Sequence, residues 1–128
     1  MKISGQATIS VCVTCRSASD AVDGPRAGAL LAEATAQACA NRPEIQVQRI
    51  SCLGNCTRGL SAAIRHERSW IYVFGHLDAS RDAASLISGA ELLAQASDGI
   101  LPWRGRPEAL KRGLIARVPP VDFCEVPP

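Results

Sequence analysis

The sequence contains no apolar run long enough for a membrane-spanning helix. Its first residues also lack the apolar stretch of a secretory signal peptide, so we expect a cytoplasmic protein with no membrane partner. The formal net charge is only +2 and aromatic residues make up only 4% of the chain, which argues against a nucleic-acid partner. Because the chain has no glycine-rich phosphate loop and no Ser/His/Asp arrangement, we do not expect an enzyme that binds nucleotides or catalyses hydrolysis.

The length and composition fit one folded domain. The 128 residues, 47% of them hydrophobic, suffice for a core that needs no cross-links. We therefore expect a single domain over 1–128, with a core over 1–100 and a C-terminal extension over 101–128. In a reducing cytoplasm, six cysteines favour metal or redox chemistry over structural disulfides.

Four of the six cysteines form two close pairs. Cys12 and Cys15 follow one strand-like run, and Cys52 and Cys56 lie in a tight loop after another, with Gly54 between them. Such a loop can point two sulfurs the same way and surround them with free backbone N–H groups. Four thiolates make a ligand set that iron–sulfur clusters and zinc both accept. The competing interpretation, ordinary buried thiols, does not account for two pairs at matching strand ends.

The hydrophobic pattern predicts an α/β protein. A strand, a helix and a second strand come first, and this order implies parallel pairing with a right-handed crossover. Parallel pairing places the ends of both strands at one edge of the sheet, so Cys12 and Cys52 should lie close together. A hairpin of two further strands, a second helix and a short basic helix follow.

The predicted elements have the following bounds. Strands are expected over 7–12, 45–50, 60–65 and 70–74, helices over 26–40, 81–96 and 108–115, and an extended tail over 119–128. The apolar stripe of the first helix is expected to consist of Ala27, Leu30, Leu31, Ala34 and Ala38.

Three kinds of site compete for the four thiols: an iron–sulfur cluster, a structural zinc ion and a thiol–disulfide exchange centre. Zinc usually takes C-x2-C pairs in domains too small to fold alone, whereas Cys52 and Cys56 form a C-x3-C pair in a domain with a core. Exchange chemistry needs a helix N-terminus next to the cysteines, and the predicted helix begins well after Cys15, at residue 26. The pattern favours a cluster and leaves a zinc site open.

The order of the elements, with cysteines after the first strand and a C-x3-C pair after the second, resembles the thioredoxin-like [2Fe–2S] ferredoxins. Almost the whole chain is also similar to a small bacterial family of predicted metal-binding proteins that are often encoded near cobalamin-biosynthesis genes. The matching stretches are VCVTCR over 11–16, CLGNCTRG over 52–59, YVFG over 72–75 and DGILPWRGRPE over 98–108.

The resemblance implies a thioredoxin-like fold, β-α-β then β-β-α, with a short extra C-terminal helix and an extended tail. It also implies a homodimer and a [2Fe–2S] cluster on Cys12, Cys15, Cys52 and Cys56. The expected role is a ferredoxin-like electron carrier for a redox partner protein, serving cobalamin biosynthesis; the alternative is a non-redox metal-binding or metal-delivery protein with zinc or another metal. The ferredoxins have a longer loop between their first two cysteines, whereas 17–24 contains no cysteine here, so Cys15 must be the second ligand if the site has four.

The other candidate ligands are expected to have structural roles. Cys39 lies within the first predicted helix and is expected to be a core thiol, whereas Cys124 lies in the tail. His66 and His76 are expected at the surface, at opposite ends of one strand, which excludes a Rieske-type pair. A separate contact surface for an acidic partner is predicted over 101–117. Its members are Trp103 as an aromatic anchor and a positive rim of Arg104, Arg106, Lys111 and Arg112.

Overall fold

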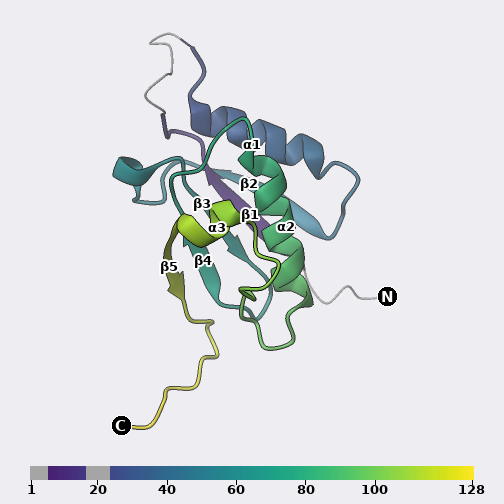
Figure 1. The fold of residues 1–128 in the computed structure, drawn as a ribbon, viewed down its shortest axis with the longest axis vertical. Helices are drawn as coiled ribbons and strands as arrows, with labels where there is room; N and C mark the ends of the chain where they lie inside the picture. Colours follow the sequence, from purple (N-terminus) through teal and green to yellow (C-terminus); the bar gives the residue numbers. More distant parts are fainter. Residues whose placement is uncertain (1–5, 17–23) are drawn as a thin grey trace.

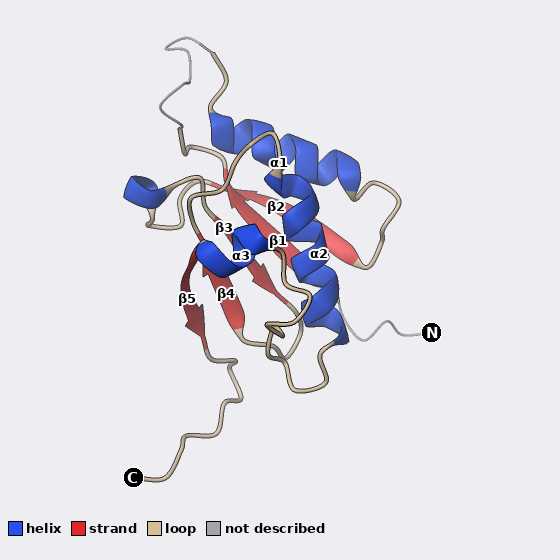
Figure 2. Cartoon of the chain, in the orientation of Figure 1, coloured by secondary structure: helices blue, strands red, loops and turns tan. Residues whose placement is uncertain are grey.

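The structure is a computed structural model in which residues 6–16 and 24–128 are described (Figure 1). Its elements are β1 (Ala7–Cys12), α1 (Ala27–Ala38), β2 (Ile45–Ile50), the 3-10 turn η1 (Cys56–Arg58), β3 (Ala62–Arg65), β4 (Ile71–Phe74), α2 (Asp82–Gln95), α3 (Glu108–Arg112) and β5 (Leu114–Val118). The strands form one sheet in the order β2-β1-β3-β4-β5. The helices lie together in front of this sheet in Figure 2, where α2 contacts both α1 and α3. The α/β prediction is confirmed.

The strand–helix–strand unit at the start of the chain is also confirmed. β1 and β2 are parallel and in register from Ala7 opposite Ile45 to Cys12 opposite Ile50. Both strands have the predicted bounds, because alternating side chains and frequent β-branched residues favour the extended backbone. This register brings Cys12 and the loop after Ile50 to the same edge of the sheet, as the topology predicted.

Helix α1 faces the sheet with a different stripe from the predicted one. Its buried residues are Ala27, Gly28, Leu31, Ala32 and Thr35, whereas the expected core residue Leu30 is 48% exposed. The physical reason is a close approach at Gly28, where an added Cβ would lie only 2.1 Å from the carbonyl oxygen of Cys12. The Gly28 N–H also donates to the carbonyl oxygen of Cys15 at 3.0 Å. The first turn of α1 therefore rests directly on the Cys12–Cys15 segment.

The second half of the sheet is antiparallel and contains a strand that the sequence did not predict. β3 and β4 form the predicted hairpin, although each begins one or two residues later than expected. The helix predicted over 108–115 ends at Arg112, and the following residues form β5, which pairs antiparallel with β4. Gly113 makes this possible, because a Cβ there would lie 2.5 Å from the carbonyl oxygen of Gly75. The helix prediction was therefore wrong for residues 113–115.

The C-terminal segment shares the core with the rest of the chain. Leu101 and Leu110 are fully buried alongside the helix and strand side chains. The Leu101 N–H donates to the phenolic oxygen of Tyr72 at 2.9 Å, which fixes this segment against β4. In the described part of the chain, none of the helices has the length and hydropathy that crossing a membrane requires.

Candidate metal centre

The four candidate thiols lie at one edge of the sheet as two pairs with different surroundings. Cys12 ends β1, and both Cys12 and Cys15 are buried. Cys52 and Cys56 are exposed in the loop that follows β2. The sulfur atoms are 3.1 Å apart in the first pair and 3.7 Å apart in the second. The structure therefore brings together each pair that the sequence singled out.

Hydrogen bonds join the two cysteine segments to each other. The Val13 N–H donates to the carbonyl oxygen of Ile50 at 2.9 Å, which extends the β1–β2 pairing by one step. The Thr14 hydroxyl donates to the carbonyl oxygen of Ser51, and the Cys12 Sγ lies 3.5 Å from the same oxygen. Because Ser51 directly precedes Cys52, these contacts place the two pairs on neighbouring segments.

The sulfur positions fit one metal per pair better than one metal for all four. Tetrahedral sulfur ligands at about 2.3 Å from a metal lie about 3.8 Å from one another. The Cys52–Cys56 distance of 3.7 Å matches this spacing, and the Cys12–Cys15 distance of 3.1 Å is slightly shorter. Among residues 6–16 and 24–128, no three His, Cys, Asp or Glu side chains gather closely enough to hold one ion. Two neighbouring thiol pairs are the donor set that a two-metal cluster uses.

In the buried pair, the surroundings shift the pKa values of the two thiols in opposite directions. Burial, together with the hydrogen bond and the charge of Cys12, raises the pKa of Cys15 to about 11. Burial also raises the pKa of Cys12, but hydrogen bonds from Cys15 and Thr14 outweigh it, so that pKa is lowered overall. Cys12 therefore becomes a thiolate first, and a metal must displace the proton of Cys15.

The exposed pair is also coupled. The hydrogen bond between Cys56 and Cys52 and the charge of the Cys52 thiolate both raise the pKa of Cys56. The charge of Cys12 adds to this effect, because it lies close enough to act from one pair on the other. Both pairs therefore share one electrostatic environment, in which binding a cation removes the repulsion between thiolates.

Glycines shape the loop around the second pair. Gly54 has a φ of 75°, which favours glycine, and its N–H donates to the Cys52 Sγ at 3.2 Å. An added Cβ at Gly59 would lie 2.9 Å from the Cys15 Sγ and 3.3 Å from the Cys15 Cβ, so any larger residue there must displace the Cys15 side chain. The predicted N–H donor around Gly54 is confirmed, and Gly59 is a further residue on which the site depends.

Asn55 anchors the loop from inside, and the sequence analysis missed it. Its side chain is only 5% exposed, and its Nδ2 donates to the Ser61 Oγ at 3.0 Å and to the carbonyl oxygen of Arg58 at 3.4 Å. These bonds tie the cysteine loop to the chain that enters β3. The available signal was an asparagine between two cysteines, which favours a turn with a side-chain hydrogen bond.

The other candidate ligands lie apart from the four thiols except for His76, whose backbone N–H donates to the carbonyl oxygen of Arg58, two residues after Cys56, at 2.7 Å. Cys39 is buried directly after the last residue of α1, so the prediction of a core thiol is confirmed. His66 lies in the β3–β4 turn at the far end of the sheet, and His76 is exposed beyond the end of β4. Cys124 is exposed, and its neighbour Phe123 stacks edge-on against Trp70 at 5.5 Å. Trp70 precedes β4 at the end opposite the thiols, so the tail is directed away from them.

Of the contact surface predicted over 101–117, the structure leaves Trp103 exposed but buries Arg106. Trp103 is 61% exposed, and Arg106 and Lys111 lie over its ring at 5.1 and 5.0 Å. Arg106 is only 9% exposed, so it belongs to no rim. Its guanidinium donates to the carbonyl oxygens of Leu101 at 2.7 Å and Pro102 at 3.2 Å. The backbone at Leu101 and Pro102 turns these oxygens inward, and Arg106 supplies their hydrogen-bond donors. Contact with a partner at this surface stays a prediction.

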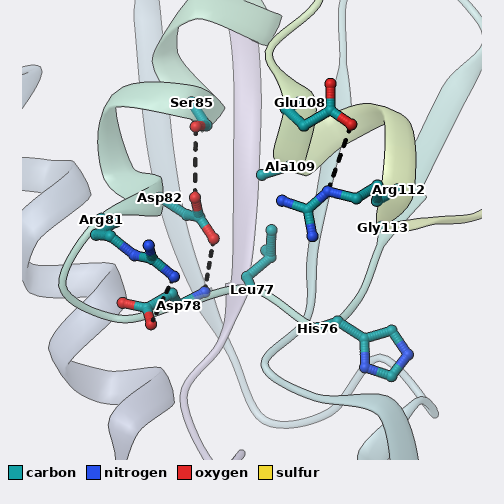
Figure 3. A pocket seen from close by; sticks show the side chains of 10 residues that line it. All are labelled: His76, Leu77, Asp78, Arg81, Asp82, Ser85, Glu108, Ala109, Arg112 and Gly113. Atoms are coloured by element: carbon teal, nitrogen blue, oxygen red, sulfur yellow. Dashed lines mark hydrogen bonds and ion pairs between the residues drawn. The ribbon is translucent and has the colours of Figure 1, made fainter.

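A pocket of about 560 Å³ lies between the start of α2 and α3 (Figure 3). Two ion pairs line it, Asp78 with Arg81 at 3.6 Å and Glu108 with Arg112 at 3.5 Å. His76 lies at its edge, and no cysteine lines it. Asp82 also lines it outside both ion pairs, and its carboxylate accepts a hydrogen bond from the Asp78 N–H at 2.7 Å. The thiol pairs remain the candidate site for metal or redox chemistry.

The fold and the thiol pairs define a class: a small α/β protein with two cysteine pairs at the ends of adjacent parallel strands. The structure is similar to that of a thioredoxin-like [2Fe-2S] ferredoxin from Aquifex aeolicus, with a TM-score of 0.56 and 14% identity over 92% of this chain and 98% of the ferredoxin. A 1.5 Å crystal structure of the wild-type Aquifex aeolicus ferredoxin gives a TM-score of 0.53 and 12% identity, over 87% of this chain and 97% of the other. At this identity the likeness shows the fold alone, and the thioredoxin-like prediction is confirmed.

The chain belongs to the family described as "Protein of unknown function (DUF1636)", which matches residues 9–120. No curated protein matches this chain. The family match extends from within β1 to just beyond β5, so it includes both cysteine pairs and the C-terminal strand.

Proposed function

We propose that this protein binds a [2Fe–2S] cluster through Cys12, Cys15, Cys52 and Cys56 and carries single electrons to a redox partner protein, without being an enzyme itself. One observation carries the proposal: the four thiols form two neighbouring pairs, of which the exposed pair, at 3.7 Å, has the spacing of two ligands on one metal and the buried pair, at 3.1 Å, is closer. The solved structures with this fold are named as [2Fe-2S] ferredoxins, which supports the same ligand set. A cluster, when bound, supplies a one-electron couple.

The chain contributes the surroundings that adjust this couple. The Gly54 N–H donates to the Cys52 sulfur, and such bonds raise the reduction potential of a cluster. The exposed guanidinium groups of Arg16 and Arg58 follow Cys15 and Cys56 closely in the chain and offset the negative charge of four thiolates. The burial of Cys15 and its partner keeps water away from one half of the site. These contributions are what a reversible electron carrier needs.

A metal-delivery protein is the alternative, and the exposure of Cys52 and Cys56 favours it. An open pair can transfer an ion such as zinc to another protein by ligand exchange. The two proposals differ in what happens on reduction. An electron carrier keeps its iron through repeated reduction and oxidation, whereas a delivery protein loses metal to a chelator or to its recipient.

Three further proposals are made: action in the cytoplasm, which rests on the sequence features described above, and a homodimeric state and service to cobalamin biosynthesis, which rest on the family resemblance. Light scattering on the purified protein measures the oligomeric state. Growth of a deletion strain that depends on its own cobalamin tests the pathway, and growth equal to that of the parent contradicts it.

The cluster itself is tested by anaerobic purification. We expect a red-brown protein with iron and sulfide in equal amounts. Cys56→Ser should lose the visible absorption, whereas Cys124→Ser, a matched change of an exposed cysteine in the tail, should keep it. A colourless protein that holds one zinc ion, even after treatment with iron and sulfide, contradicts the proposal and supports the alternative.

A further inference from the structure

The surface around the exposed cysteine pair carries positive charge that no described carboxylate neutralises. Arg58 lies two residues after Cys56, and Arg16 directly follows Cys15; both side chains are exposed. Arg26 is exposed as well, and its guanidinium donates to the carbonyl oxygen of Thr14, between the two buried cysteines, at 2.9 Å. Within residues 6–16 and 24–128, no ion pair joins any of these three arginines to an acid.

The rest of the described surface carries both paired and unpaired arginines. Its arginines near the helices are paired with acids: Arg42 with Glu91, Arg49 with Glu33, Arg81 with Asp78 and Arg112 with Glu108. At the far end of the sheet, Arg68 lines a shallow pocket together with Glu67 and Asp98. Arg65, Arg104 and Arg117 are exposed and have no described ion pair either, but Arg16, Arg26 and Arg58 are the unpaired arginines that lie close to the thiols, in the chain or, for Arg26, through its bond to Thr14, in a protein with a net charge of only +2.

The same edge is where the thiols are most accessible. Cys52, Gly54, Cys56 and Arg58 are all exposed, whereas the other cysteine pair is buried behind them. The turn η1, which contains Cys56 and Arg58, stands out from the body of the protein at the left of Figure 1. An electron exchanged with another protein takes the shortest path at this exposed loop.

We propose that the Cys52–Gly59 loop and the three arginines Arg16, Arg26 and Arg58 form the docking surface for a redox partner with an acidic surface. The proposal rests on the proposed function and adds the partner's chemistry to it. Positive charge at the point of electron exit attracts an acidic partner, accelerates the encounter and orients it with the exposed pair foremost. This surface is separate from the one around Trp103.

The test measures electron transfer to small probes of opposite charge. Reduced protein gives one electron to hexacyanoferrate(III), which becomes hexacyanoferrate(II), or to the cation tris(phenanthroline)cobalt(III), which becomes the cobalt(II) complex. We expect Arg58→Glu to slow oxidation by the anion about tenfold at low ionic strength, because the reversed charge repels a trivalent anion at close range. The same variant should accelerate oxidation by the cation.

Arg68→Glu is the matched control, since Arg68 is an exposed arginine with the same change of net charge at the far end of the sheet. We expect it to change either rate less than twofold. Equal effects of the two variants overturn the docking proposal, because only net charge would then matter. If the purified protein shows no cluster spectrum, the proposed function fails first and the docking proposal falls with it, so the two failures are distinguishable.

A binding measurement tests the chemistry of the partner directly. Poly-L-glutamate serves as the acidic probe in isothermal titration calorimetry with the purified protein, and poly-L-lysine serves as its opposite. We expect poly-L-glutamate to bind the wild type and the Arg68→Glu variant, with affinity that falls as salt is added, and to bind Arg58→Glu at least fivefold more weakly. Equal binding to all three proteins overturns the proposal, as does preferential binding of poly-L-lysine.

Discussion

Gly28→Ala is the substitution for which the structure makes the sharpest prediction. The added Cβ would lie 2.1 Å from the carbonyl oxygen of Cys12 and 3.2 Å from that of Cys15. Real Cβ atoms do not approach other atoms below 3.0 Å, so the helix and β1 must separate by about 0.9 Å. Both groups in this clash are backbone, and neither can turn away as a side chain can.

Two opposing effects set the magnitude. Alanine favours a helix over glycine by up to about 1 kcal/mol, which alone would stabilise the variant. Overpacking against a fixed backbone costs typically about 1–3 kcal/mol, and this contact is at the severe end. We expect the free energy of unfolding to fall by about 2 kcal/mol, which corresponds to a melting temperature roughly 8 °C lower for a domain of this size. The displaced Cys12–Cys15 segment should also bind less iron.

Gly89→Ala is the control, because it is also a glycine-to-alanine change inside a helix. Its Cβ would lie 2.4 Å from a methyl group of Leu110, which is the flexible end of a side chain. We expect its free energy of unfolding to stay within about 1 kcal/mol of the wild type. Thermal unfolding of the reduced, metal-free proteins gives both values. A Gly28→Ala protein as stable as Gly89→Ala would refute the close approach of α1 to the cysteine segment.

Three other outcomes follow from the same structure. In the reduced, metal-free protein, iodoacetamide should modify Cys52 and Cys56 before Cys15, because only the first two are exposed; peptide mass spectrometry gives the order, and equal rates would contradict the burial. Zinc binding by this protein should tighten as the pH rises toward 11, since the raised pKa of Cys15 keeps its proton in competition with the metal below that value; chelator competition at several pH values measures it, and a flat profile would contradict it. Arg106→Gln should lower the free energy of unfolding by about 2 kcal/mol because buried carbonyl oxygens lose a charged donor, whereas Arg104→Gln at an exposed position should change it by less than about 0.5 kcal/mol; urea unfolding distinguishes them, and equal values would contradict the inward position of Arg106.

Much of the cysteine edge could be predicted from the sequence, because it depends on local patterns and one topological rule. Alternation over 7–12 and 45–50 gave both strands their bounds, and parallel pairing then brought Cys12 close to Cys52. The contact of α1 with Cys15 was missed, because the segment between them is long in sequence although its ends meet in space. Only a structure shows that the start of α1 comes back to Cys15.

The errors arose where a tertiary contact outweighed a local preference. Gly28 was omitted from the apolar stripe of α1, yet its missing side chain is the reason that this face of the helix is buried. Leu114–Val118 follows a basic helical segment without a proline, so the predicted helix was extended into it as far as Ile115; its strand conformation depends on pairing with β4. Arg106 was counted as a surface charge, because no sequence pattern shows that the carbonyl oxygens of Leu101 and Pro102 are turned inward and accept hydrogen bonds from it.

The strand β5 also covers an edge of the sheet that could otherwise pair with other copies of the chain. β4 carries the run Ile-Tyr-Val-Phe, whose β-branched and aromatic residues pair readily with any free strand edge. β5 occupies that edge with the largely exposed run Leu114–Val118, which includes the charged Arg117. All four thiols precede β3, so a chain shortened before Leu114 keeps every ligand. Such a chain leaves β4 open to other copies, and it fails by aggregation rather than by loss of the metal site.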